Sequence, residues 1–148
     1  MAATAELPKA ARQLGWAGLL PFVGGAGLLW FVRAEAHPYV ALALTAYAGL
    51  IVSFLGGIHW GFAFRQPLPA VAGQTALLVW GVVPSLVAWV ALLMPASAGL
   101  VVHGCMLLVC YAVDRQVYPQ QGAAAWLGLR FRLSAVAALS CFLGAAGT

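Results

Sequence analysis

The chain has 148 residues, of which 64% are hydrophobic and only 7% are charged, and its formal net charge is +4. Soluble domains contain about 25% charged residues, so this composition excludes an ordinary soluble globule and favours a protein embedded in a bilayer. The basic excess does not indicate nucleic acid as a partner, because no basic run interleaved with aromatic residues is present.

Five segments are apolar and long enough to cross a membrane, which takes about 20 residues each. Stretches rich in Pro, Gly and charged residues separate them, as loops require. We therefore expect a single all-α transmembrane domain, a polytopic bundle of five helices embedded in the bilayer. The predicted spans are 14–32, 39–64, 74–94, 98–113 and 125–146.

The first span, 14–32, has two interpretations, a cleaved signal peptide or a retained anchor. Its apolar part is longer than the roughly 7–15 residues of a signal core, and further spans follow it, so a retained anchor is favoured. Trp16 and Trp30 flank the segment as interfacial anchors do. Pro21 and the glycines after it predict a loosened helix.

The second span carries small or hydroxylated residues at intervals of four, a spacing that lets helices approach closely in lipid. Four residues advance about 40° beyond one full turn, so the row drifts around the helix and suits contacts with two neighbours. General glycine richness of the chain is the alternative explanation. The residues predicted to pack helices are Gly49, Ser53, Gly56, Gly57, Trp60 and Gly61.

Ionisable residues gather near one end of the predicted bundle. His59 lies near the end of the second span and Asp114 ends the fourth. Both spans run in the same direction, so the two side chains are expected at a similar depth. Polar groups inside a membrane face other helices or water and usually find partners. The predicted cluster contains His59, Asp114, Arg115, Arg130, Arg132 and Arg65.

This cluster has a structural and a functional interpretation, and the sequence leaves both open. A guanidinium can bind a carboxylate through two bonds, which would clasp the inner ends of spans two, four and five. Alternatively, an imidazole that titrates near neutral pH would suit a proton relay or an anion-binding pocket.

Catalytic and metal-binding patterns are absent from the sequence. It contains no HExxH, no nucleophile elbow, no phosphate loop and no dinucleotide fingerprint. The three cysteines have no recognised ligand spacing, and His103 is expected far in depth from His59, which disfavours haem ligation by two histidines. We therefore predict no catalytic residue, no metal and no cofactor, and hence no enzyme.

The basic residues predict the orientation of the bundle. Six of the seven fall on one side of the predicted spans, and Arg33 alone falls on the other. By the positive-inside rule, the N-terminus is cytoplasmic and the C-terminus lies outside. The six are Lys9, Arg12, Arg65, Arg115, Arg130 and Arg132.

Three motifs resemble a known family: "SFLGGIHWG" at 53–61, "YAVDR" at 111–115 and "LGLRFRLS" at 127–134. They are similar to the small multi-pass family called domain of unknown function 3429. The resemblance implies a bacterial inner membrane, or the mitochondrial inner membrane in eukaryotic relatives, and it brings no activity with it. Its implied signature positions are Gly56, Gly57, His59, Trp60, Gly61, Asp114 and Arg130.

The function favoured by these observations is a non-catalytic inner-membrane component that acts in assembly, as an accessory or as a scaffold. Its expected partners are the lipid bilayer and either a second copy of the chain or another membrane protein. The alternative is a small transporter, channel or lipophilic-ligand-binding protein that uses the layer of His59 and Asp114. An enzyme acting on lipid or quinone ranks third.

Overall fold

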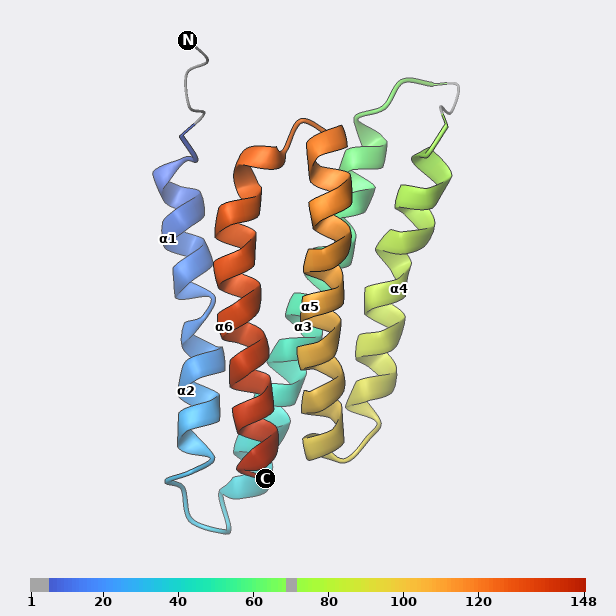
Figure 1. The fold of residues 1–148 in the computed structure, drawn as a ribbon. Helices are drawn as coiled ribbons and strands as arrows, with labels where there is room; N and C mark the ends of the chain where they lie inside the picture. The colour runs from blue at the N-terminus through green and yellow to red at the C-terminus, as the bar shows by residue number, and fades with distance from the viewer. Residues whose placement is uncertain (1–5, 69–71) are drawn as a thin grey trace.

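The structure is a computed structural model that describes residues 6–68 and 72–148, and these form a bundle of helices without strands (Figure 1). A short 3-10 helix, η1 (Ala124–Trp126), precedes the last α-helix. The α-helices are α1 (Lys9–Ala17), α2 (Leu20–Leu28), α3 (His37–Phe64), α4 (Gln74–Leu92), α5 (Ala96–Gln120) and α6 (Leu127–Ala146). The prediction of an all-α fold is confirmed.

The predicted first span is present as two short helices, α1 and α2. Pro21 in the first turn of α2 has no N–H to donate to the Ala17 carbonyl, and its ring would collide with that carbonyl in a continuous helix. The helix therefore ends at Ala17 and resumes at Leu20. At this break, the Tyr47 hydroxyl of α3 donates a hydrogen bond of 2.8 Å to the Gly18 carbonyl.

Within the described residues, four helices are long and apolar enough to cross a membrane, namely α3, α4, α5 and the η1–α6 segment. Helices α1 and α2 stack end to end beside α6, and together they extend along most of its length (Figure 1). A count of five crossings thus requires the stacked pair to act as one span. The start of α1 and the end of α6 lie at opposite ends of the bundle (Figure 1).

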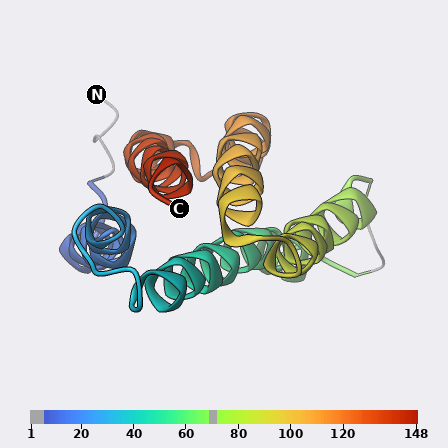
Figure 2. The ribbon, with the colours of Figure 1, turned by 90° about the horizontal axis from the view of Figure 1, so that it is seen from below.

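Helix α3 is the central element, because it contacts α2, α4, α5 and α6. Its 28 residues correspond to about 42 Å, which exceeds the roughly 30 Å of a hydrocarbon core. A helix this long is accommodated by tilting. In the view along the bundle, α3 and α4 extend across the picture because they are tilted, whereas α1 and α2 are superposed (Figure 2).

The bounds of α3 and α4 differ from the predicted spans by two residues at one end each, and those of α5 differ most. It continues two turns beyond the predicted end at Val113, through Arg115 to Gln120. Polar residues end an apolar pattern, but they do not end a helix unless the backbone is also interrupted. This extension places Tyr118 on the same helix face as Asp114, one turn further on.

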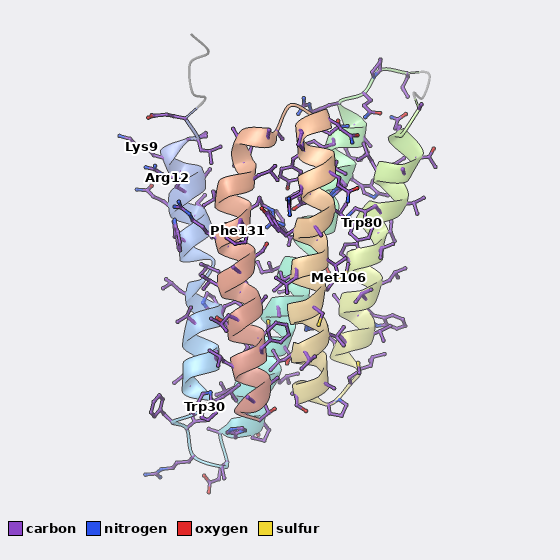
Figure 3. All side chains as sticks on the ribbon, in the orientation of Figure 1. Lys9, Arg12, Trp30, Trp80, Met106 and Phe131 are labelled. Carbon is purple, nitrogen blue, oxygen red and sulfur yellow. The ribbon has the colours of Figure 1, made fainter. Side chains whose placement is uncertain are left out.

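The outside of the bundle is apolar, as a lipid-embedded protein requires. Large hydrophobic side chains such as Phe31, Leu50 and Phe54 are exposed. Lys9 and Arg12 lie near the end of the bundle where α1 begins, and Trp30 lies near the other end (Figure 3). The interior contains mostly alanine, leucine and other small or aliphatic residues.

Candidate functional site

Three ionisable side chains from three helices meet in the interior: His59 of α3, Asp114 of α5 and Arg130 of α6. We call them the polar triad. The Arg130 guanidinium donates two hydrogen bonds to Oδ2 of Asp114, from Nε at 2.9 Å and from Nη2 at 2.6 Å. The other carboxylate oxygen, Oδ1, lies 3.5 Å from Nε2 of His59. Exposed fractions are 1% for His59 and Asp114 and 9% for Arg130.

A tight turn between α5 and α6 places the two charged partners beside each other. Gly122 has a φ of 70°, a left-handed conformation that side chains other than glycine rarely adopt. The chain reverses there, and the Ala123 N–H bonds back to the Tyr118 carbonyl at 2.8 Å. Helices α5 and α6 thus become antiparallel neighbours, so residues 114 and 130 face each other.

Both ring nitrogens of His59 face hydrogen-bond acceptors. Nδ1 lies 3.4 Å from the Leu55 carbonyl one turn earlier, and Nε2 faces Asp114. A neutral imidazole donates to only one of these acceptors, whereas a protonated imidazole donates to both. Three aromatic rings enclose the imidazole at centroid distances of 6.0 to 6.4 Å, and they belong to Phe62, Trp80 and Tyr118.

The remaining arginines of the predicted cluster lie outside the triad. Arg65, Arg115 and Arg132 are exposed, and none of them forms an ion pair with another described residue. Arg132 is two residues from Arg130, which rotates it about 200° around α6 and points it away from the triad. The structure therefore brings together three of the six predicted cluster residues.

The glycines predicted to pack helices divide between two environments. Gly49 and Gly56 are buried, and a Cβ built on Gly56 would collide with the backbone carbonyl of Gly81 in α4. Gly57 and Gly61 are exposed, and a Cβ on either would meet no heavy atom within 4 Å. Close contact between α3 and α4 thus depends on Gly56, while Gly57 and Gly61 lie away from the neighbouring helices.

The other two residues predicted to pack helices make hydrogen bonds. Trp60 donates from Nε1 to the Leu78 carbonyl of α4 at 3.0 Å, and its ring lies against Gly81. Ser53 donates to the Gly49 carbonyl of its own helix at 2.9 Å. Trp60 therefore links α3 to α4, whereas the hydroxyl of Ser53 bonds within α3.

A pocket of about 630 Å³ lies on one side of the triad, between the α1–α2 pair, α3 and α6. We call it the lipophilic pocket, because most of its lining is apolar. Its polar lining includes Arg65, Tyr118, Arg130 and Ser134. Ser134 is 2% exposed, and its Oγ has no hydrogen-bond partner among the described residues.

A second pocket of about 330 Å³ lies on the other side of the triad, between α3, the start of α4 and the end of α5. We call it the glutamine pocket, after Gln66, Gln120 and Gln121 in its lining. His59 and Trp80 also line it. Because His59 lines the glutamine pocket and Arg130 lines the lipophilic pocket, the triad stands between the two.

Among the described residues, no group of three or more His, Cys, Asp or Glu side chains is placed to bind a metal ion. His103 is fully buried near Gly49, where a built Cβ would lie 3.3 Å from its Nε2. Gly49 is ten residues before His59, which is about 15 Å along α3. The two histidines therefore lie at different levels of the bundle.

Sequence analysis missed two residues beside the triad, Tyr118 and Ser134. Each follows a triad member by four residues, Asp114 and Arg130 respectively, and a spacing of four puts two side chains on one helix face. That spacing was the available signal. It carries little weight by itself, because every buried helix face contains many such pairs.

Comparison with known proteins identifies relatives that are named as membrane proteins. Transmembrane protein 69 of Xenopus tropicalis is 48% identical over 88 residues, which are 60% of this chain and 34% of that protein. Transmembrane protein 69 of Mus musculus is 35% identical over 88 residues, which are 60% of this chain and 35% of that protein. The matched region thus spans about a third of these relatives. No solved structure matches the chain.

The family itself is identified by a match that covers nearly the whole sequence. Residues 7–146 match the family described as "Protein of unknown function (DUF3429)". The resemblance expected from the motif around His59 is therefore confirmed, and this chain belongs to the DUF3429 family of membrane proteins.

Proposed function

We propose that this chain is a non-catalytic component of an inner membrane, acting in assembly, as an accessory or as a scaffold, with the polar triad as the clasp of its helices. One observation supports this most. Asp114 and Arg130 are the only Asp, Glu, Lys or Arg side chains buried in the described residues, and they bind each other. Charges engaged in this way fix α5 against α6 and are withheld from a substrate.

We further propose that the chain crosses the membrane five times, with α1 and α2 as one interrupted crossing. The N-terminus then faces the cytoplasm or matrix and the C-terminus faces the opposite side. The basic residues support this orientation, since all but Arg33 lie on α1, at the end of α3, in the last two turns of α5 or in the first two turns of α6, which are at the same end of the bundle. The relatives named as transmembrane proteins support a membrane setting.

The proposal is tested by isolating the full chain from its membrane in a mild detergent. Blue-native electrophoresis and chemical crosslinking are expected to give a stable assembly, either of several copies or with another membrane protein. Recovery of the free monomer alone, with no crosslinked partner, would contradict the scaffold role.

A small transporter or channel is the second candidate, and the position of the triad favours it. The triad stands between the two pockets, with His59 on one side and Arg130 on the other. Both ring nitrogens of His59 face acceptors, so a protonated imidazole could donate a hydrogen bond to each of them, as a proton-carrying group in a transporter would. Five crossings are few for alternating access, so this candidate requires a dimer.

Transport is tested with the full chain in liposomes that enclose a pH-sensitive dye. A transporter gives proton or proton-coupled flux that His59→Gln abolishes while Arg132→Gln, an exposed control, leaves it intact. Flux equal to that of empty liposomes would remove this candidate and leave the clasp unaffected.

A further inference from the structure

We propose that the lipophilic pocket binds an uncharged lipophile that carries a carbonyl oxygen, with Ser134 donating a hydrogen bond to that oxygen. This inference goes beyond the scaffold and transport roles, and it requires neither. The occupant is a small membrane-soluble ketone or quinone type of molecule. Its apolar body lies along the helices, and its carbonyl points to the end where Ser134 and Arg130 lie.

The dimensions and lining of the pocket suit such a molecule. Its volume of about 630 Å³ falls within the roughly 300–1,000 Å³ typical of small-molecule sites. Leu14, Leu19 and Phe22 line one wall, and Leu129 and Leu133 line another. An apolar wall with a few polar groups at one end is the usual design of a site that binds and orients a lipophile.

Ser134 is the observation that points to a ligand. Its hydroxyl is buried, lines the pocket and has no hydrogen-bond partner among the described residues. Burying a hydroxyl without a partner is unfavourable, so a donor or acceptor in the pocket would relieve it. Ser140 on the same helix shows the ordinary outcome, since its Oγ donates to the Val136 carbonyl at 2.9 Å.

Charge balance favours an uncharged occupant over an anion. Arg130 lines the pocket, but its charge is already neutralised by the carboxylate of Asp114. Arg65 is the other cation in the lining, and it is exposed, where its charge is solvated. The polar end of the pocket therefore offers donors without an excess of positive charge, which suits a carbonyl oxygen better than a phosphate.

The test uses the purified full chain, stripped of lipid in detergent and titrated with 2-decyl-1,4-benzoquinone as the probe. Quenching of tryptophan fluorescence reports affinity, because Trp126 lines the pocket, and native mass spectrometry reports the number of bound probes. We expect saturable binding of one probe. Ser134→Ala is expected to weaken it about three- to tenfold, the effect of one uncharged hydrogen bond. The matched control Ser140→Ala is expected to leave the affinity unchanged.

Two filling variants locate the site: Ala137→Phe from the wall formed by α6, and Ala11→Trp from the half-buried edge on α1. Each is expected to abolish saturable binding, and Ala11→Trp remains informative if Ala137→Phe does not fold. The proposal is overturned if both folded variants bind the probe like the original chain, which would mean partition into micelles.

Two further outcomes also overturn the proposal. In the first, Ser134→Ala raises the melting temperature of the empty protein and leaves the probe affinity unchanged. The buried hydroxyl would then only destabilise the fold and would have no part in binding. In the second, phosphatidylglycerol displaces the probe, and its affinity depends on Arg65 and not on Ser134. The site would then belong to an anionic lipid headgroup.

Discussion

Asp114 and Arg130 show how the effect of a buried charge depends on its partner. Taking both ions out of water is costly, and their attraction offsets that cost only when the geometry is good. Here one carboxylate oxygen accepts two hydrogen bonds from the guanidinium. Removing either partner would therefore cost far more than removing both, because it would leave a single charge buried.

Asp114→Asn is expected to lower the free energy of unfolding by about 3–5 kcal/mol, because it leaves the Arg130 guanidinium buried beside an uncharged amide. Unfolding by sodium dodecyl sulfate in mixed micelles, followed by circular dichroism, measures the change. Arg132→Gln is the control, since this side chain is exposed on the same helix as Arg130.

The double variant Asp114→Leu with Arg130→Met completes this test. It is expected to recover most of the lost stability, because two apolar side chains replace the ion pair. A single Asp114→Asn variant that is as stable as the original chain would show that the pair contributes nothing to the clasp.

The sequence was sufficient to place His59 and Asp114 together and insufficient to select the arginine. Span direction alone puts both residues near one end of the bundle. Arg65, Arg115, Arg130 and Arg132 all belong to that end, and which of them is buried depends on the rotation of each helix about its axis. Rotation is set by packing against several neighbours, and a single strongly apolar span shows almost no periodicity from which to derive it.

Helix α3 supplies the hydroxyl that stabilises the break between α1 and α2. The Tyr47 hydroxyl donates to the Gly18 carbonyl, and the Tyr47 ring packs edge-on against Phe22 at a centroid distance of 5.1 Å. In lipid a carbonyl without a donor is unfavourable, so this single bond joins the interrupted pair to the central helix.

Tyr47→Phe is expected to cost about 1 kcal/mol of stability, the usual effect of one uncharged hydrogen bond. Hydrogen exchange at residues 14–22 is also expected to become faster, because the break loses its donor. Tyr39→Phe is the control, since Tyr39 is 76% exposed. Unchanged exchange at residues 14–22 would mean that the bond does not hold the break in place.

Two adjacent glycines of α3 provide a test of helix packing with a built-in control. Gly56→Ala is expected to destabilise the chain, because the new methyl group would collide with the Gly81 carbonyl. Gly57→Ala is expected to be neutral or to stabilise by up to about 1 kcal/mol, since it points into open space and alanine favours a helix. Thermal unfolding in detergent measures both, and equal effects would contradict the packing.

The recurrence of small residues on α3 does not tell which of them lie against a neighbouring helix. A row spaced by four drifts around the helix, so Gly49 is buried while Gly57 and Gly61, further along the same row, are exposed. Gly56 lies outside the row, and yet a Cβ built on it would collide with the Gly81 carbonyl of α4. The recurrence of small residues therefore indicates a helix suited to close packing, but it does not identify the residues at the contact.

Three long apolar helices, α3, α4 and α5, separate the loop before α3 from the segment before α6, and this predicts that the two segments lie on opposite faces of the membrane. The loop before α3 and the segment before α6 lie at opposite ends of the bundle (Figure 1), and they contain Glu35 and Ala125 respectively. With the expected orientation, Glu35→Cys faces the outside and Ala125→Cys faces the cytoplasm.

Labelling in spheroplasts measures this in a variant without native cysteines. A membrane-impermeant maleimide is expected to label Glu35→Cys in intact spheroplasts and to label Ala125→Cys only after permeabilisation. Labelling of both positions from one face would contradict three crossings between them, and the opposite pattern would invert the orientation. The native cysteines to be replaced are Cys105, Cys110 and Cys141.

Composition and hydropathy predicted the class of this molecule and the approximate ends of most of its helices, because lipid permits few backbone arrangements. The division of the first span into α1 and α2 was foreseen only as a loosening at Pro21. The two pockets were not foreseen, since they arise from side chains of helices that are far apart in the sequence. Leu14 and Ser134, for example, line one pocket from opposite ends of the chain.

The ion pair joins the last two long helices, and this has a consequence for biosynthesis. Asp114 leaves the ribosome before Arg130 does, so the emerging chain exposes a lone acid until α6 follows. A polypeptide that stops short of α6 would keep that acid without its counter-ion, and membrane proteases and insertases would then have a chemical mark that separates unfinished copies from finished ones.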